Sequence, residues 1–277
     1  MRTMLYIGLT VMLLTSCGYS SATGLPLQAA DKEQLDSRDD ARTSDHHTGA
    51  GKLARRKLTL AQLREKYKET FKYRGSAEER KIALTFDDVP DDRYTAQVLD
   101  VLKKYEVKAT FFVVGYRALR HPGLVRRMVA EGHAIGNHSF NHPLFTRVPL
   151  DKFVQQLARA DAAIRPLAGY SPKLFRPPYG EVNEEQVRWA KANDYLIVNW
   201  DVDSSDWRSI RSDKVIRNVL SAIRPGSIVL QHAGGGIGED LSGTVNALPV
   251  IIQKARSQRY ELVTLPELLH ARKDRQP

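Results

Sequence analysis

The chain has 277 residues, of which 42% are hydrophobic, and this is enough for one substantial folded domain with appended segments. The formal net charge of +10 admits a nucleic-acid-binding protein, but the basic residues are scattered and no stacking-aromatic motif accompanies them. A solvated basic surface that faces an anionic polymer or lipid fits this composition better. The single cysteine, Cys17, excludes an intramolecular disulfide.

The first residues have the pattern of an export signal. A short basic segment precedes the apolar run Met4–Leu14, which has signal-peptide length and is too short to span a bilayer. Residues Leu14–Cys17 then resemble a bacterial lipobox, in which the cysteine is cut free and acylated. An ordinary cleaved signal that contains a cysteine by chance is the alternative. We expect residues 1–17 to be a lipoprotein signal peptide and Cys17 to be lipidated, with the mature protein exported and anchored to the cell membrane, or otherwise secreted.

A polar segment separates this signal from the first expected helix. Residues 18–58 hold few aliphatic side chains and cannot bury enough apolar surface to fold alone, which predicts a disordered tether. Basic residues in its second half favour an anionic membrane or cell wall. From Thr59, a helical spacing of apolar residues predicts a short helix that ends at about Lys72, within a linker at 59–79.

Short apolar strands alternate with amphipathic helices over residues 80–272. The expected strands are Ile82–Phe86, Ala109–Val114, Ala134–Asn137, Lys173–Phe175, Tyr195–Asn199, Ser227–Leu230 and Glu261–Thr264. The alternation predicts an α/β fold with parallel strands and crossover helices. Candidate polar residues follow several different strands rather than one switch point, which favours a barrel of seven strands over an open sheet.

Two carboxylates, Asp87 and Asp88, follow the first of these strands, where α/β folds place their chemistry. Successive side chains of a strand point to opposite faces. The chain must therefore leave strand geometry for both acids to share one site, and the nearby Pro90 favours this. A solvated acidic turn is the alternative.

His138 and His142 follow the third strand, four positions apart. Their imidazoles would lie on one face if the backbone were helical there. With one carboxylate they would make a metal site that leaves coordination positions open, as catalytic zinc requires. Alone the pair is a weak signal, because exposed histidines at this spacing are common by chance.

Two further segments follow strands. In Arg176–Gly180, consecutive prolines predict a rigid loop whose backbone amides could face an oxyanion. Arg176 could hold a carboxylate bidentately and keep it ionised, although a plain structural turn would also explain the prolines. Residues Trp200–Trp207 place three acids between two indoles, which suits a sugar ring, or equally a solvated loop anchored by core tryptophans.

The last segment is His232, which ends a strand, followed by the glycine run Gly234–Gly238. A lone histidine in such a place is more often structural than catalytic. The glycine run does not open a helix, as a nucleotide-binding loop must, and it predicts a flexible loop.

Taken in order, these five segments resemble the motifs of the polysaccharide deacetylase family, the NodB homology domain or carbohydrate esterase family 4, over about residues 80–270. The resemblance implies a distorted (β/α) barrel of about seven strands with outer helices, and a divalent metal, usually zinc. The resemblance implies that Asp87 is the general base, oriented by Arg176, and that His232 is the general acid, supported by Asp206. It implies that the Tyr179 amide donates to the oxyanion. The implied metal ligands are Asp88, His138 and His142, and the implied pocket walls are Trp207, Leu230 and Pro178. One departure is Val89, where the family often has glycine, and a β-branched residue would be strained if φ were positive there.

The resemblance implies a metal-dependent hydrolase that removes N-acetyl groups from a polymer of N-acetylglucosamine. Peptidoglycan is preferred because a tethered enzyme meets the wall first, with chitooligosaccharides or poly-N-acetylglucosamine as the nearest alternative. Acetylxylan esterase activity and a catalytically inactive carbohydrate-binding lipoprotein are more distant alternatives. We expect an N-acetylated polysaccharide substrate, membrane contact through the lipid anchor, no nucleic acid partner and a monomer.

Overall fold

The structure is a computed structural model that describes residues 57–275. The expected signal peptide, Cys17 and the tether up to residue 56 lie outside the described residues. In the part that is described, no helix combines the length and the apolar character needed to cross a membrane.

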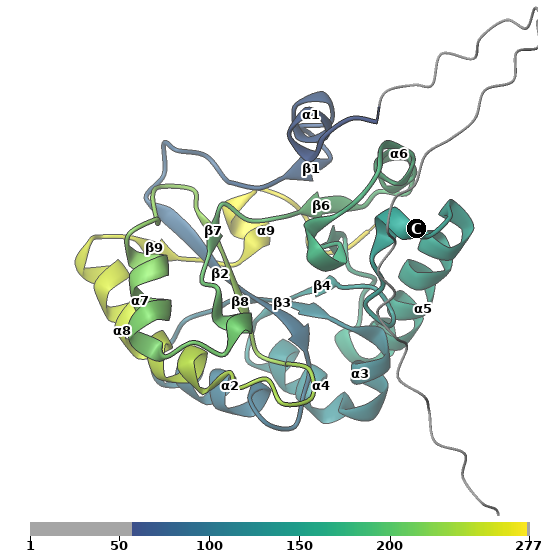
Figure 1. The fold of residues 1–277 in the computed structure, drawn as a ribbon. Helices are drawn as coiled ribbons and strands as arrows, with labels where there is room; N and C mark the ends of the chain where they lie inside the picture. Colours follow the sequence, from purple (N-terminus) through teal and green to yellow (C-terminus); the bar gives the residue numbers. More distant parts are fainter. Residues whose placement is uncertain (1–56, 276–277) are drawn as a thin grey trace, which may run out of the picture. The chain divides into compact units, whose positions relative to one another are not determined.

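A single sheet of parallel strands organises this part of the chain (Figure 1). Eight of its nine strands follow the order β1-β6-β5-β4-β3-β2-β8-β7, and the ninth, β9, pairs with the start of β2. The strands are β1 (Phe71–Lys72), β2 (Lys81–Val89), β3 (Thr110–Val113), β4 (Ala134–Asn137), β5 (Leu174–Phe175), β6 (Leu196–Val198), β7 (Val202–Asp203), β8 (Ile228–His232) and β9 (Glu261–Leu262). Since β1 and β7 end the path without pairing to each other within the described residues, the sheet is a curled half-barrel. The predicted class, a distorted parallel barrel, is confirmed.

Helices surround the sheet, most of them on its outer face, and the last packs against the inward apolar residues. They are α1 (Leu60–Lys66), α2 (Thr95–Lys104), α3 (Gly115–Arg120), α4 (Pro122–Ala130), α5 (Leu150–Ala168), α6 (Glu184–Ala192), α7 (Ser212–Leu220), α8 (Ser242–Ser257) and α9 (Leu265–Leu268), with 3₁₀ turns η1 (Phe145–Arg147), η2 (Pro178–Gly180) and η3 (Asp206–Arg208). A large apolar cluster joins α2, α4, α5, α7 and α8 to the outward residues of the central strands, such as Phe111 and Val229.

The inward residues of the same strands fill the half-barrel. Alternation along β3 turns Phe112 inward, where it belongs to a second cluster with Ala83, Ile228 and two leucines of α9. Since β9 and α9 lie at the start of β2, this apolar filling leaves the carboxyl ends of the strands for polar groups. Parallel-barrel enzymes place their active sites at that end.

The segment before β2 differs from the prediction. The expected helix begins after Thr59, whose side chain forms a capping box with Gln62, but it ends at Lys66 rather than near Lys72. Residues Phe71–Lys72 form the edge strand β1, which pairs with β6. Phe71 is buried, so the burial of this aromatic ring draws the expected linker into the folded unit. The short β7 and α3 were also not predicted.

Candidate active site

The carboxyl ends of the strands surround a pocket of about 490 Å³. Its lining includes Asp87 and Asp88 from β2, His138 and His142 after β4, and His232 from β8. These side chains come from segments far apart in the sequence, and the structure brings all five together. The pocket is further lined by Tyr116, Arg117, Asn141, Tyr179, Trp200, Asp203, Trp207, Leu230, Gly236 and Glu239.

Asp88 reaches the pocket because β2 is irregular at its end. The register between β2 and β3 shifts between Phe86 and Val89, and Asp88 has a φ of 61°. The predicted departure from strand geometry is therefore confirmed, and both aspartates line one pocket. The positive φ falls at Asp88, whereas Val89 is buried in the apolar core and lies outside the left-handed region.

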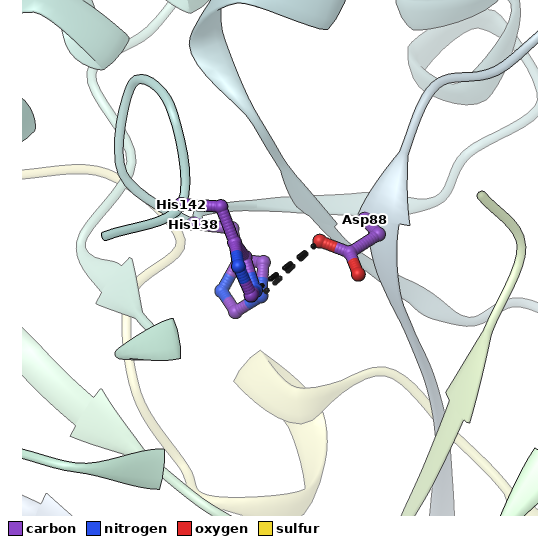
Figure 2. A group of neighbouring side chains, drawn as sticks. All are labelled: Asp88, His138 and His142. Carbon is purple, nitrogen blue, oxygen red and sulfur yellow. Dashed lines mark ion pairs between the residues drawn. The ribbon is translucent and has the colours of Figure 1, made fainter. Parts of the chain in front are cut away.

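Asp88, His138 and His142 form a group suited to a metal ion (Figure 2). The Asp88 Oδ1 atom lies 3.8 Å from His138 Nε2 and 3.4 Å from His142 Nε2. Two ligands bonded to one tetrahedral zinc at the usual bond lengths are about 3.4 Å apart, so these distances fit the ion with little adjustment. One carboxylate and two imidazoles are also a donor set that zinc accepts while keeping a position open.

The two histidines are brought together by a loop rather than by a helix face. Ser139 and His142 both have positive φ, at 66° and 61°. The His142 N–H donates to Ser139 Oγ at 2.9 Å, and Gln156 Oε1 accepts from the backbone amides of Phe140 and Asn141, each at 3.0 Å. The helical geometry considered for this pair is therefore wrong, although the pairing itself occurs.

A buried hydrogen bond orients His138 toward the ligand position. Its Nδ1 atom lies 2.7 Å from the carbonyl oxygen of Arg176, which can only accept, so Nδ1 carries the proton and Nε2 keeps its lone pair. Burial, with the nearby His142, lowers the pKa of His138 to about 3. A neutral ring held through its other nitrogen is the form that ligates metals.

Asp87 is buried beside the fully buried Arg176. Nη1 of Arg176 donates to Asp87 Oδ1 at 2.7 Å and to Thr85 Oγ1 at 2.8 Å. Its remaining nitrogens donate to the carbonyls of Val198 and Asn199. Arg176 therefore contacts Asp87 through one nitrogen and one oxygen, and the bidentate contact considered for Arg176 is wrong.

The other oxygen of Asp87, Oδ2, lies 3.7 Å from His138 Nε2, on the side of the metal ligands. Burial raises the pKa of Asp87 and outweighs the opposing charges of Arg176 and His232. The arginine therefore orients the carboxylate without setting the net direction of its pKa.

Asp206 holds His232 from behind the pocket. His232 Nδ1 and Asp206 Oδ1 are 2.8 Å apart, and the His232 backbone N–H donates to Asp206 Oδ2 at 2.8 Å. Burial alone would lower the pKa of His232, but the charge and hydrogen bonds of Asp206 raise it to about 9. The three acids predicted in one loop separate: Asp203 lines the pocket, whereas Asp201 accepts hydrogen bonds at the start of β8.

The remaining predicted residues take different positions. Tyr179 has a φ of 59°, is exposed, and its ring lies edge-on to His142 with centroids 4.8 Å apart. Trp207 is half-exposed and Leu230 is buried, and both line the pocket. Pro178 is buried and is not among the residues that line the pocket, so its predicted place in the pocket wall is wrong.

The glycine run is fixed at its start rather than flexible throughout. Gly234 and Gly235 are buried, and a Cβ atom at Gly234 would lie 2.0 Å from the carbonyl oxygen of Asp88. Sequence reasoning also missed Arg117, which lines the pocket, because an arginine on a short helix has no pattern that separates it from a surface charge.

Comparison with known proteins agrees with this geometry. A family profile described as polysaccharide deacetylase matches residues 74–198. A peptidoglycan-N-acetylglucosamine deacetylase of Bacillus cereus is 41% identical over 211 residues, which cover 76% of this chain and 75% of the relative. A chitooligosaccharide deacetylase of Bradyrhizobium is 38% identical over 68% of this chain and 90% of its own length. Other relatives are longer, and the chain spans only 39% of the peptidoglycan-N-acetylglucosamine deacetylase of Listeria monocytogenes.

Solved structures with a similar fold also include deacetylases of this kind. The crystal structure of a peptidoglycan N-acetylglucosamine deacetylase superposes with a TM-score of 0.76 at 40% identity, covering 79% of this chain and 100% of the other. Identity of this size over three quarters of the chain is sufficient to assign the family. The chain belongs to the polysaccharide deacetylase family and is a deacetylase of the hydrolase class.

Proposed function

We propose that this chain is a metal-dependent hydrolase that removes N-acetyl groups from an N-acetylglucosamine-containing polysaccharide, with peptidoglycan as the substrate. The observation that carries the proposal is the convergence of Asp87, Asp88, His138, His142 and His232 on one pocket. A catalytically inactive binding protein would have no need of a base, an acid and three metal ligands in one place.

The three ligand side chains would hold a divalent ion, most simply zinc. Such an ion supplies Lewis-acid chemistry, since it lowers the pKa of water and polarises the acetyl carbonyl. Asp88 and His142 hold their positions through left-handed backbone at each residue, and His138 through its hydrogen bond to the Arg176 carbonyl.

The chain's own groups then move the protons. Asp87 takes the proton of the attacking water through Oδ2, while Arg176 holds Oδ1 and keeps the carboxylate aimed at the pocket. Its raised pKa makes it a better base than an exposed carboxylate. The Tyr179 amide donates to the developing oxyanion.

His232 protonates the leaving nitrogen through Nε2, since Asp206 occupies Nδ1. With a pKa of about 9 it carries this proton at neutral pH. Trp207 and Leu230 line the pocket and would form apolar walls beside the bound substrate.

Peptidoglycan is preferred because the Bacillus cereus relative bears that name and matches 76% of this chain. The chitooligosaccharide deacetylase of Bradyrhizobium supports the nearest rival. Purified protein with zinc should be incubated separately with de-O-acetylated peptidoglycan and with chitin oligomers, and the acetate released should be measured. Faster release from peptidoglycan is expected, release from chitin oligomers alone would reverse the order, and release from neither would reject the proposal.

We further propose that the protein is exported and anchored to the membrane through Cys17. The support is the sequence alone: a signal-length apolar run, a lipobox-like end and one cysteine at the acylation position. Cells that express the full chain should be labelled with a fatty-acid analogue. Label is expected on the wild-type protein and absent from Cys17→Ser; equal labelling of both would reject the anchor.

A further inference from the structure

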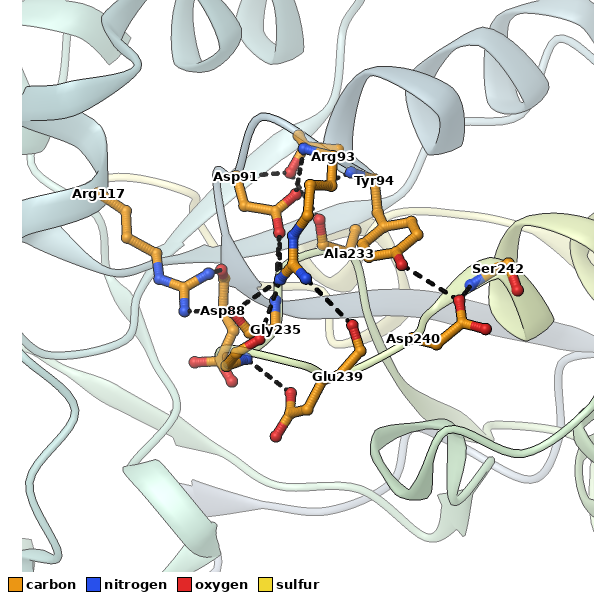
Figure 3. A network of polar contacts seen from close by, with 12 residues as sticks. Asp88, Asp91, Arg93, Tyr94, Arg117, Ala233, Gly235, Glu239, Asp240 and Ser242 are labelled. Atoms are coloured by element: carbon orange, nitrogen blue, oxygen red, sulfur yellow. Dashed lines mark hydrogen bonds and ion pairs between the residues drawn. The ribbon is translucent and has the colours of Figure 1, made fainter.

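The carbonyl oxygen of Asp88, one of the proposed metal ligands, accepts a hydrogen bond from Arg117 beside the glycine loop (Figure 3). Nη1 of Arg117 donates to this oxygen at 2.7 Å. Gly234 packs against the same contact, since a β-carbon there would come within 2.0 Å of the Asp88 oxygen and 2.7 Å of Arg117 Nη1. The Asp88 backbone has a φ of 61°, a conformation that a non-glycine residue rarely adopts without support.

All three nitrogens of the Arg117 guanidinium donate hydrogen bonds in this region. Nη2 donates to the Gly235 carbonyl at 3.0 Å, and Nε to the Tyr116 hydroxyl at 3.1 Å. A planar guanidinium presents its donors in a fixed fork, so one side chain sets the distance between the Asp88 carbonyl and the Gly235 carbonyl. Among the described residues, Arg117 forms no ion pair with a carboxylate, so its hydrogen bonds to these neutral oxygens are its polar contacts.

Arg93 closes the same loop from the far side, as Figure 3 shows. Its Nη2 atom donates to the carbonyls of Gly235 and Gly236 at 3.2 and 3.1 Å, and its Nη1 atom to the carbonyl of Glu239 at 3.1 Å. The Asp91 carboxylate accepts one hydrogen bond from Arg93 Nη2 at 3.3 Å and another from the Gly235 N–H at 3.4 Å. The glycine loop is thus tied to the segment that follows Asp88, and Arg117 is the link that reaches Asp88 itself.

We propose that Arg117 is a positioning residue for the metal centre: by gripping the Asp88 and Gly235 carbonyls together, it holds the Asp88 carboxylate in register with His138 and His142. This inference rests on the proposed metal site. Groups that orient metal ligands from behind typically change metal affinity by about 10- to 100-fold when they are removed.

Charge alone predicts the opposite effect. A guanidinium beside a cation site repels the cation, so removal of Arg117 would tighten metal binding if electrostatics dominated. If the hydrogen bonds of Arg117 to the backbone carbonyls dominate, removal of Arg117 weakens metal binding. The sign of the change therefore separates the two explanations.

The test uses the full chain, stripped of metal with a chelator, and zinc affinity measured by competition with a chromophoric chelator. Arg117→Ala should weaken zinc binding by about 10- to 100-fold, and Arg117→Lys, which keeps the charge but loses the fork, should be intermediate. Arg126→Ala is the matched control, because Arg126 is exposed on α4 and does not line the pocket; its affinity should stay at the wild-type value. Affinity of Arg117→Ala equal to or tighter than wild type would overturn the proposal.

Melting temperatures with and without zinc separate positioning from a general structural role. A merely structural arginine would lower both temperatures equally, whereas a positioning arginine also reduces the rise that zinc produces. If Arg117→Ala does not fold, Arg117→Lys decides, since wild-type affinity in that variant would overturn the proposal. Gly234→Ala would place a β-carbon within 2.0 Å of the Asp88 carbonyl oxygen and 2.7 Å of Arg117 Nη1, so it should disrupt the same contact and weaken zinc binding as well.

Zinc binding is measured here without substrate. Loss of affinity in Arg117→Ala would support the inference even if no polysaccharide were deacetylated. Acetate release by a wild type whose zinc affinity does not depend on Arg117 would uphold the function and reject the inference.

Discussion

Asp206 grips His232 twice, through the ring Nδ1 at 2.8 Å and through the backbone N–H at 2.8 Å. The Thr244 hydroxyl donates to the same carboxylate at 2.6 Å, so both oxygens of the buried Asp206 accept hydrogen bonds. The pair fixes the imidazole in one orientation and presents its free nitrogen to the pocket. It also explains why the pKa of His232, a residue that the sequence left open between a structural and a catalytic role, is raised in the folded protein.

The first prediction concerns the pH dependence of activity. If His232 is the general acid, kcat falls as the pH rises through its pKa of about 9. Asp206→Asn removes the charge that raises this pKa, so the alkaline limb should move toward the ordinary value of 6.5. Rates of acetate release between pH 5 and about 10 measure the shift. An unchanged alkaline limb in Asp206→Asn would show that another group controls it.

The second prediction concerns stability in the same pair. The pKa of His232 is raised from 6.5 to about 9, so the folded state binds this proton more tightly than the unfolded state. Its contribution to the free energy of unfolding is complete below about pH 6.5 and is lost as the pH rises to about 9. The loss corresponds to about 3 kcal/mol.

Denaturant unfolding of the metal-free protein at several pH values measures this contribution. Wild type should lose stability over that range. Asp206→Asn should show a much flatter dependence, and parallel curves for the two proteins would contradict the assignment.

The third prediction concerns the buried pair of Arg176 and Asp87. Arg176→Met leaves the Asp87 carboxylate buried without its cation and should destabilise the fold by about 3–5 kcal/mol. The double variant with Asp87→Asn removes the unpaired charge and should regain part of this loss. The free energies of unfolding of both single variants and the double variant complete the cycle, and strict additivity would show that the two side chains are not coupled.

The sequence indicated which side chains meet in the pocket, because polar residues of suitable chemistry follow the ends of several strands. Asp88 and His138 could be placed at strand ends by the apolar runs before them, and the parallel fold then brings those ends together. The sequence did not show how the backbone brings these side chains together. The left-handed backbone of Asp88, Ser139 and His142 follows from tertiary contacts, and none of these residues is a glycine that would signal it.

Features that depend on long-range packing were missed for the same reason. The two-residue strands β1 and β7 have no periodicity to detect, and they exist because β6 and β8 offer them partners. The glycine run looked like a flexible loop, since nothing in the local sequence shows that Gly234 must pass within reach of the Asp88 carbonyl. The family resemblance implied that Pro178 is a pocket wall, but Pro178 is buried and does not line the pocket.

The fourth prediction isolates the base. Asp87→Asn keeps the shape of the side chain but cannot take a proton, so kcat should fall by about 100- to 10,000-fold. Zinc affinity should change little, because Asp88 and the two histidines remain. Acetate release and chelator competition are measured on the same preparation. Full activity in this variant would show that another group removes the proton.

The fifth prediction concerns the half-exposed indole at the pocket rim. Trp207 lines the pocket with Leu230 but makes no polar contact with the metal ligands, so it should contribute to substrate binding more than to proton transfer. Trp207→Ala removes a flat apolar face suited to a sugar ring and should raise KM by about 3- to 10-fold, with a smaller change in kcat. Trp207→Phe keeps part of that face and should recover part of the loss. Steady-state kinetics on a soluble oligomer give both constants, and a fall in kcat at unchanged KM would mean that the indole acts on the reacting group instead.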